Sequence, residues 1–424
     1  MEDAIQQAVQ TRAVPVQAGD NAGTDSFAPL TESLDDTRVV GVGLPAAADA
    51  GLTGVHTQLL RYLVAERGVR VIGYDGEFAA AFVLGEYLAG TRDDLDHVLE
   101  RIGQSPWRTA AGVSFLEWLR SANADRGPDE QVRVAGLAAR TLEPAVARLV
   151  DYFEEVDPAF LETVQHNLDR IIELTSDSEE DDADHLAANF PPGVSSSGAA
   201  GDRKQLIEAA DRLLPSLRDR LDAHQDEYTA VTDRIAWERA THLVTLLEQA
   251  VSLRWPVTLQ ADGKIEQETA SQRSWHLAAL GMADNADWLL GVEAAESMAV
   301  VAAAPVVARS EQTVGNPGVD VQLLGSLLDA RYGQAYYALG FEHAPGSASS
   351  PAPTGGIDYG DTTVGKDSTP EHPVAAALAT LETDTVLLDF ETARANERLA
   401  QWLDEQSVTA AFDGYCVVDE WAAS

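Results

Sequence analysis

Asp75 and Glu77 are the two side chains of this 424-residue chain whose types and spacing best suit acid–base chemistry. Two nearby carboxylates can divide the roles of acid and base when burial separates their pKa values. Both follow the apolar run from Gly68 to Tyr74, and ligands of parallel α/β sheets bind beyond the carboxyl ends of the strands. The pair would equally suit a solvated helix start, where the helix dipole favours negative charge.

A histidine and an arginine are the other candidates for a site at this edge of the sheet. His56 falls in the first turn of a predicted helix, where it could act as a base near neutral pH or simply belong to the core or surface. Arg108 stands in the string Pro106-Trp-Arg-Thr109, and an arginine beside a large aromatic residue can clamp a carboxylate or stack on a ring. The alternative for this string is a tryptophan that packs its loop against the core.

The sequence does not indicate metal or cofactor chemistry. The histidines other than His56 show no paired spacing typical of metal ligands. The phosphate-binding glycine loop, the serine nucleophile between glycines and the His-Glu-x-x-His string are all missing from the sequence. Gly41 and Gly43 lack the third glycine of a dinucleotide fingerprint and predict a tight turn. We therefore expect neither a metal nor a cofactor.

The charge balance excludes some classes of partner. The chain has 69 acidic and 29 basic residues, a formal net charge of -40, which repels nucleic acids and anionic membranes. The acidic residues are dispersed from Glu2 to Glu420, which favours a halophilic surface over a single interaction tail. Molar salt screens the self-repulsion of such a surface, because the Debye length is about 3 Å at 1 M. The expected partner is a small molecule or a protein.

Cysteine content and the N-terminal sequence predict a cytoplasmic protein. Cys416 is the single cysteine, so we expect no intrachain disulfide and a reducing compartment. The N-terminal stretch lacks the cationic start and apolar core of a signal peptide. No segment approaches the about 18 uninterrupted apolar residues of a membrane span.

The elements that would position the candidate residues alternate in type along the chain. Short β-branched runs and amphipathic stretches alternate from about residue 38, which predicts an α/β fold with a mainly parallel central sheet flanked by helices. The predicted strands span residues 37–43, 68–74, 131–137, 298–304, 335–341 and 385–390. Predicted helices of the first half span residues 54–66 and 78–88.

Strand patterns are scarce between about residues 142 and 290, where long helical periodicity predicts a large helical insertion. Two stretches rich in Gly, Pro and Ser, residues 176–203 and 344–372, predict mobile loops. The predicted organisation is an N-terminal extension (1–36), the first half of the α/β core (37–141), the insertion (142–290) with its acidic flexible loop (176–203), and the second half of the core (291–424).

Several short strings occur in an order typical of a known family. Between about Val39 and Val418 the chain resembles the erythromycin esterase family, whose members hydrolyse the macrolide lactone ring or are hydrolase-like proteins of unknown substrate. The resemblance implies an α/β core interrupted by helices. It is carried by Val39-Val-Gly-Val-Gly43, Gly68-Val-Arg-Val-Ile72, Pro106-Trp-Arg-Thr109, Glu117-Trp-Leu119, Met282-Ala-Asp-Asn285, Val307-Ala-Arg309, Tyr336-Tyr-Ala-Leu-Gly-Phe341 and Leu387-Leu-Asp389.

The chain departs from this family at the positions that the resemblance assigns to chemistry. His56 stands for the basic residue usual on the helix after the first strand, and Asp75 for the glutamate after the second strand. The first-loop glutamate, the water-activating histidine, two later histidines and an aspartate after the third strand are replaced. The replacing residues are, in that order, Leu44, Ala47, Ala303, Val306 and Ala138.

These departures predict a catalytically inactive member of the family that binds a ligand or partner through the former active-site cleft. Water attack on an ester needs a positioned base and charge stabilisation, each of which contributes orders of magnitude in rate. The alternative is an active ester hydrolase with a rewired site around His56, Asp75, Glu77 and Arg108. A third possibility is an interaction protein that uses its helical insertion, so the sequence leaves open whether the chain is an enzyme.

Overall fold

An eight-stranded sheet forms the centre of the molecule. The computed structural model of the chain describes residues 2–16, 24–45, 54–103, 105–176, 200–314, 319–343, 373–381, 383 and 385–418. The strand order is β1-β9-β10-β8-β2-β5-β3-β4, and all pairings from β10 to β4 are parallel. This confirms the predicted mainly parallel sheet. The strands are β1 (Val14–Pro15), β2 (Val39–Leu44), β3 (Val71–Glu77), β4 (Arg133–Ala138), β5 (Met298–Ala303), β8 (Tyr336–His343), β9 (Thr385–Asp389) and β10 (Gly414–Val418).

The two central strands are apolar and covered on both faces. Every residue of β2 and β5 is buried, as the near-continuous hydrophobic runs of parallel sheets require. One face packs against the helices η1 to α5 and the other against α12 to α14. These helices are η1 (Thr24–Leu30), α2 (Gly54–Glu66), α3 (Phe82–Leu88), α4 (Leu95–Arg101), η2 (Pro106–Arg108), α5 (Ala110–Ala124), α12 (Gln267–Val292), α13 (Ala304–Val307) and α14 (Leu324–Tyr332).

The second strand ends later in the structure than predicted, and the helix after it begins later than predicted. We expected residues 68–74 and 78–88, whereas β3 continues to Glu77 and α3 begins only at Phe82. The register with β4 shifts between Tyr74 and Glu77, which is a bulge that lets the strand continue. Gly136 makes room for this bulge, because a Cβ there would lie 2.5 Å from the carbonyl oxygens of Gly76 and Glu77. Asp75 and Glu77 therefore belong to a strand and not to a helix start.

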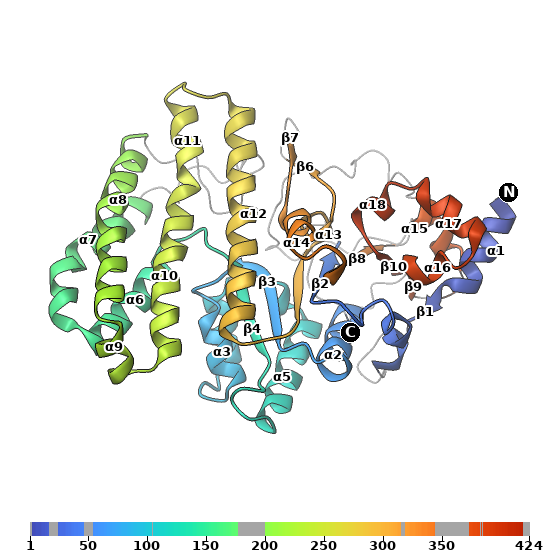
Figure 1. Cartoon of the computed structure of the whole chain (residues 1–424), viewed down its shortest axis with the longest axis horizontal. Coiled ribbons are helices and arrows are strands. Elements are labelled where there is room, and N and C mark those ends of the chain that lie inside the picture. Colours follow the sequence, from blue (N-terminus) through green and yellow to red (C-terminus); the bar gives the residue numbers. More distant parts are fainter. Residues whose placement is uncertain are drawn as a thin grey trace.

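A large helical insertion follows β4, as predicted. Figure 1 shows its helices beside the β4 edge of the sheet, with the long α12 leading back to β5. Helices α7, α8 and α10 pack side by side, and α10 also packs on α6 and α12. The helices of the insertion besides α12 are α6 (Glu143–Val156), α7 (Pro158–Ser176), α8 (Ala200–Ala223), α9 (Gln225–Val231), α10 (Arg234–Ser252) and α11 (Arg254–Ala261).

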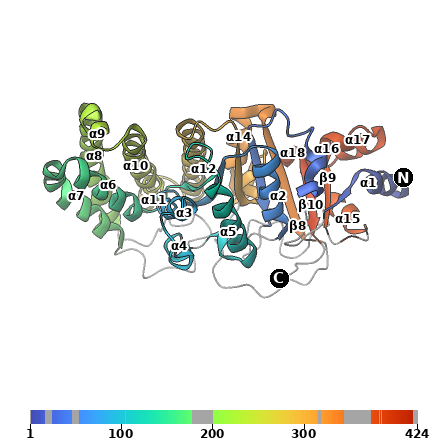
Figure 2. The same cartoon turned by 90° about the horizontal axis from the view of Figure 1, so that it is seen from below.

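At the opposite end of the sheet, elements from the N-terminal and C-terminal parts of the described chain pack together. Strand β1 pairs antiparallel with β9, and α1 packs against α15 and α17 (Figures 1 and 2). The predicted strands do not include β1, β10 or the small antiparallel pair β6 (Gln312–Val314) and β7 (Val319–Val321); β1, β6 and β7 are each only two or three residues long. The remaining elements are α1 (Glu2–Arg12), η4 (Gly333–Ala335), α15 (Pro373–Ala379), α16 (Phe390–Ala393), α17 (Glu397–Asp404) and α18 (Val408–Ala411).

The two predicted mobile loops fall mainly outside the described residues. Of the first, residues 177–199 lie outside, while Ser176 ends α7 and residues 200–203 begin α8 and are helical. Of the second, residues 344–372 all lie outside. The division of the chain at residues 36, 141 and 290 stays a prediction.

Candidate functional site

A buried ion pair occupies the carboxyl edge of the sheet. Asp75 of β3 pairs with the guanidinium of Arg140, which stands two residues after the end of β4. The two side chains are only 4% and 7% exposed. Arg140 is not among the site residues predicted from the sequence, although its position just after a parallel strand is a signal that could have identified it.

Glu77 is held beside this ion pair by four donor contacts. Its carboxylate accepts hydrogen bonds from the backbone N–H groups of Arg140 and Thr141 at 3.2 Å and from the Thr141 hydroxyl at 3.0 Å. Burial raises the pKa of Glu77, and the charge of Arg140 and these donors only partly offset the rise. Burial alone would lower the pKa of Arg140, but the charges of Asp75 and Glu77 outweigh it and raise that pKa. The guanidinium thus stays charged.

The ion pair leaves two polar atoms unused. Among the described residues, neither Oδ2 of Asp75 nor Nε of Arg140 has a hydrogen-bond partner, and both atoms are buried. A buried polar group without a partner costs about 1–3 kcal/mol. Such atoms in a native site are candidates for contact with water or a ligand.

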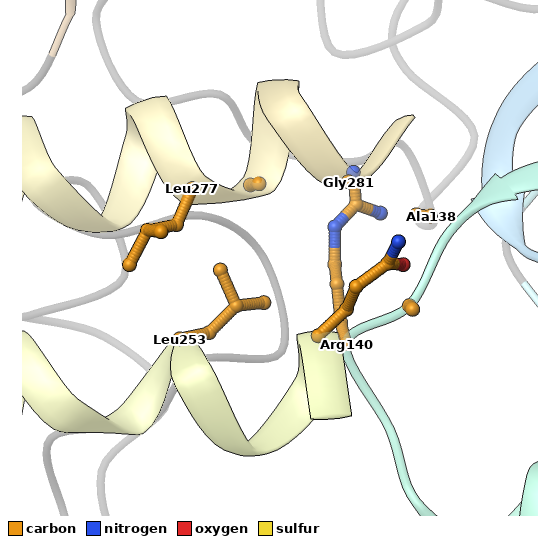
Figure 3. A pocket seen from close by; sticks show the side chains of 8 residues that line it. Ala138, Arg140, Leu253, Leu277 and Gly281 are labelled. Atoms are coloured by element: carbon orange, nitrogen blue, oxygen red, sulfur yellow. The ribbon is translucent and has the colours of Figure 1, made fainter. Parts of the chain in front are cut away.

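Arg140 also lines a small recess between the sheet and the insertion. We call it the Arg140 recess; it lies between the end of β4, the junction of α10 and α11, and α12 (Figure 3). Its cavity volume is about 10 Å³, which is about the least room that one water molecule needs. Its lining includes Ala138, Arg140, Gln249, Leu253, Leu277 and Ala278.

A pair of amide side chains fixes one wall of the Arg140 recess. Gln249 of α10 and Asn285 of α12 donate hydrogen bonds to each other at 3.2 Å and 3.0 Å. Asn285 also donates to the carbonyl oxygen of Leu137 in β4 at 2.7 Å. Gly281 leaves room for this contact, because a Cβ there would lie 3.2 Å from the Gln249 amide. The amide pair therefore holds α10 and α12 to the end of β4.

The structure does not bring His56 and Arg108 to Asp75 and Glu77. The buried ring of His56 packs on Phe341 of β8, with ring centroids 4.3 Å apart. Strands β2 and β5 lie between β8 and β3, which separates those two strands by about 14 Å at the usual spacing of about 4.8 Å. Arg108 is exposed and donates to the carbonyl oxygen of Gly103 at 3.4 Å.

The tryptophan beside Arg108 packs into the core. Trp107 is 0% exposed and lies between Tyr74 and Phe115, with ring centroids 5.7 Å and 5.8 Å away. Of the two interpretations of the string Pro106-Trp-Arg-Thr109, this geometry favours the loop-packing tryptophan over the arginine clamp.

Four of the five positions where the resemblance expects lost catalytic residues lie in the described part of the chain, and all four are buried and apolar. Leu44 and Ala303 are register partners at the ends of the neighbouring strands β2 and β5. Val306 is buried in the short helix α13, and Ala138 is the register partner of Glu77. Ala47 lies outside the described residues.

His242 of α10 is a second buried titratable group in this region. Its ring stacks on Trp288 with centroids 4.0 Å apart and lies 4.9 Å from that of Phe78, which follows Glu77. The pKa of His242 is lowered from 6.5 to about 3, chiefly by burial and also by the charge of Arg218, while a hydrogen bond with Asn285 opposes the change. The imidazole is therefore neutral in the folded chain.

The neutral His242 predicts a loss of stability in mild acid. The unfolded chain binds a proton at this residue as the pH falls below about 6.5, and the folded chain does not, so acid favours unfolding. When the pH falls from 7.5 to 5.5, the free energy of unfolding of the wild type should decrease by about 1 kcal/mol more than that of His242→Phe. Denaturant titrations at both pH values measure this difference. The exposed-site variant His166→Gln should behave as the wild type, and equal pH dependence in all three proteins would contradict the assignment.

The described residues contain neither a cluster suited to a metal ion nor a helix suited to a membrane span. Within the described ranges, no cluster of three or more His, Cys, Asp or Glu side chains is arranged to hold a metal ion. Among the described helices, none combines the length and apolar character that a membrane span requires.

Comparison with known proteins finds one matching family model and several solved structures of similar fold. The family model described as erythromycin esterase matches residues 64–420, so the loop with Leu44 and Ala47 precedes the matched region. A Bacillus cereus protein of known structure is 16% identical with a TM-score of 0.74, and the match covers 99% of this chain and 97% of that one. A succinoglycan biosynthesis protein is 14% identical with a TM-score of 0.69, over 99% and 97% of the two chains.

A third solved structure comes from the matching family itself. It is a mutant of the erythromycin esterase EreC in its open conformation, 17% identical with a TM-score of 0.64, and the match covers 97% of this chain and 98% of that one. At these identities the three structures establish the fold of the chain.

Proposed function

The chain belongs to the erythromycin esterase family, and from this membership we propose that it is a non-catalytic member that binds a ligand at the former active-site edge of its sheet. The observation that carries the proposal is the apolar, buried state of the positions expected to hold the family's acids and bases. Leu44 and Ala303 are neighbours on the two central strands, and neither side chain can take a proton or polarise a carbonyl group.

The polar residues that remain at this edge are largely committed to one another. Asp75 pairs with Arg140, and Glu77 accepts hydrogen bonds from Arg140 and Thr141. A carboxylate held by a buried guanidinium is a weak base, because proton transfer to it would break the ion pair. This arrangement supports binding more than hydrolysis.

Assays of ester hydrolysis test the proposal directly. We expect the full chain in molar KCl to hydrolyse neither erythromycin nor p-nitrophenyl acetate faster than Asp75→Asn or a no-protein control, because general acid–base and electrostatic catalysis are both missing. Release of acid and of nitrophenolate measures the two reactions. Turnover by the wild type that disappears in Asp75→Ala or His56→Ala would overturn the proposal.

The alternative of an active hydrolase with a rewired site rests on the carboxylate pair. Its support is the raised pKa of Glu77, due to burial, together with the unpartnered Oδ2 of Asp75 among the described residues. Because His56 and Arg108 lie elsewhere, this alternative predicts turnover that falls in Asp75→Asn and Glu77→Gln and persists in Arg108→Met. Uniform absence of turnover eliminates it.

A further inference from the structure

A second carboxylate site lies at the carboxyl edge of the sheet, on β8, the strand next to β2. Glu342 stands near the end of β8, and its side chain is partly exposed. Within the described residues, its carboxylate accepts one hydrogen bond, from the hydroxyl of Tyr415 in β10 at 2.7 Å, and forms no ion pair. Burial raises the pKa of Glu342, and the hydrogen bond from Tyr415 offsets the rise only in part.

Other carboxylates in the interior of the sheet region have more partners. Asp75 pairs with the guanidinium of Arg140, and Glu77 accepts four hydrogen-bond contacts. Asp389 accepts hydrogen bonds from two hydroxyl groups and one backbone N–H group. Charges that leave water are normally paired or well hydrogen-bonded in folded proteins. The single neutral donor of Glu342 therefore sets this carboxylate apart.

The hydroxyl of Tyr415 reaches Glu342 because a glycine lies opposite the tyrosine. The register pairs Tyr415 with Gly340 and Val417 with Glu342, so these four residues belong to one face of the sheet. A Cβ at Gly340 would lie 2.6 Å from Cε2 of Tyr415. The missing side chain thus lets the ring lie against β8, and one carboxylate oxygen of Glu342 is held by the hydroxyl. The other oxygen has no donor among the described residues.

This carboxylate belongs to the sheet edge where the proposed function places the ligand. Gly43 is the register partner of Gly340, and β2 ends one residue later, so Glu342 lies just past the end of β2. Helix α13, which carries Val306, packs on both β2 and β8. Val306 and Tyr415 belong to the same apolar cluster.

We propose that Glu342 binds the ammonium group of a small organic cation at this edge, with the Tyr415 hydroxyl holding the carboxylate in place. The inference rests on the proposed function, because it names the ligand class of the same edge. An ammonium group supplies the positive charge and the N–H donors that this carboxylate lacks within the described chain. A neutral ligand would leave the carboxylate without a counter-charge, and an anionic ligand would be repelled by it.

Three probes with the same alkyl chain and different charge test the proposal. They are butylammonium, 1-butanol and butanoate, titrated against the full chain by ligand-observed NMR at constant ionic strength in molar KCl. We expect saturable binding of butylammonium, with 1-butanol and butanoate each binding at least about tenfold more weakly because neither supplies a positive charge. Binding of either of these two as tight as that of butylammonium would overturn the proposal.

A pair of charge-matched variants separates the site from the general attraction of cations to an acidic chain. Glu342→Gln keeps the shape of the side chain, removes its charge and should weaken butylammonium binding at least about tenfold. Glu405→Gln removes the same charge at an exposed position and should leave the affinity unchanged. Equal affinities of Glu342→Gln and the wild type would place the cation elsewhere and contradict the assignment.

A measurement on the wild type decides the question if Glu342→Gln fails to fold. Bound butylammonium should give intermolecular nuclear Overhauser effects to the ring protons of Tyr415, which tyrosine labelling and the variant Tyr415→Phe identify. Saturable binding without these effects rejects the site at Glu342. Failure of this proposal and of the proposed function can be told apart, because ester turnover would reject only the latter and the probe titrations test only the former.

Discussion

Replacing Arg140 with methionine lowers the free energy of unfolding by about 3–5 kcal/mol, because the change leaves the carboxylate of Asp75 buried without its partner. Asp75 is 4% exposed, so water cannot take over the role of the guanidinium. The same substitution removes the positive charge that partly offsets the effect of burial on Glu77, whose pKa is already raised. Urea titrations in molar KCl measure the loss.

An exposed ion pair and a double variant serve as controls for this prediction. Arg234 pairs with Glu238 in α10 and is 80% exposed, so Arg234→Met should cost less than about 1 kcal/mol. The double variant Asp75→Leu with Arg140→Met removes both charges and should recover a large part of the stability. If Arg140→Met lowers the free energy of unfolding no more than Arg234→Met does, the Asp75–Arg140 pair is not desolvated.

Replacing Asn285 with leucine should destabilise the chain by about 3 kcal/mol, because its hydrogen bonds with Gln249 and Leu137 at a fully buried site are lost. The substitution strands the carbonyl oxygen of Leu137 and one donor and one acceptor of Gln249. Thermal unfolding and denaturant titrations measure the loss.

The matched control for Asn285 is an asparagine on the surface. Asn167 is exposed in α7, and Asn167→Leu should change the unfolding free energy by no more than about 0.5 kcal/mol. A similar small change for Asn285→Leu would mean that the amide pair does not hold α10 and α12 to the sheet.

The strings that the chain shares with its family carry structural polar contacts. Asn285, from the string Met282-Ala-Asp-Asn285, joins the insertion to β4. Arg309 follows the loop after β5 and binds Asp413 at 2.8 Å, as well as Asp329 and the carbonyl oxygen of Tyr336. Asp389 accepts from the hydroxyls of Tyr337 and Ser33 at 2.8 Å and caps α16.

These contacts would hold the framework together if the family's catalytic chemistry is lost, as we propose. Each of them lies within the sheet or ties a helix to it, while Leu44, Ala138, Ala303 and Val306 are buried apolar residues. Loss of buried framework partners would cost several kcal/mol, whereas exchange of a polar site residue for a well-packed apolar one is often neutral. The fold is thus expected to survive the loss of the family's catalytic side chains.

The sequence alone determined the class of fold and the edge of the sheet where the candidate site lies. Buried strands of a parallel sheet are short β-branched runs, and helices show a period of 3.6 residues, so both are visible in local patterns. The same patterns placed Asp75 and Glu77 at the carboxyl edge. The bulge that extends β3 was not visible, because it depends on the close approach of Gly136 on a neighbouring strand.

Only the tertiary structure decided which side chains meet at that edge. Asp75 pairs with Arg140, 65 residues away in the chain, whereas His56 faces Phe341. The deciding fact is the strand order β8-β2-β5-β3-β4, which makes β3 and β4 neighbours and sets β8 apart from them. Strand order is fixed by how the helices pack across the whole sheet, so no local pattern at Asp75 or His56 encodes it.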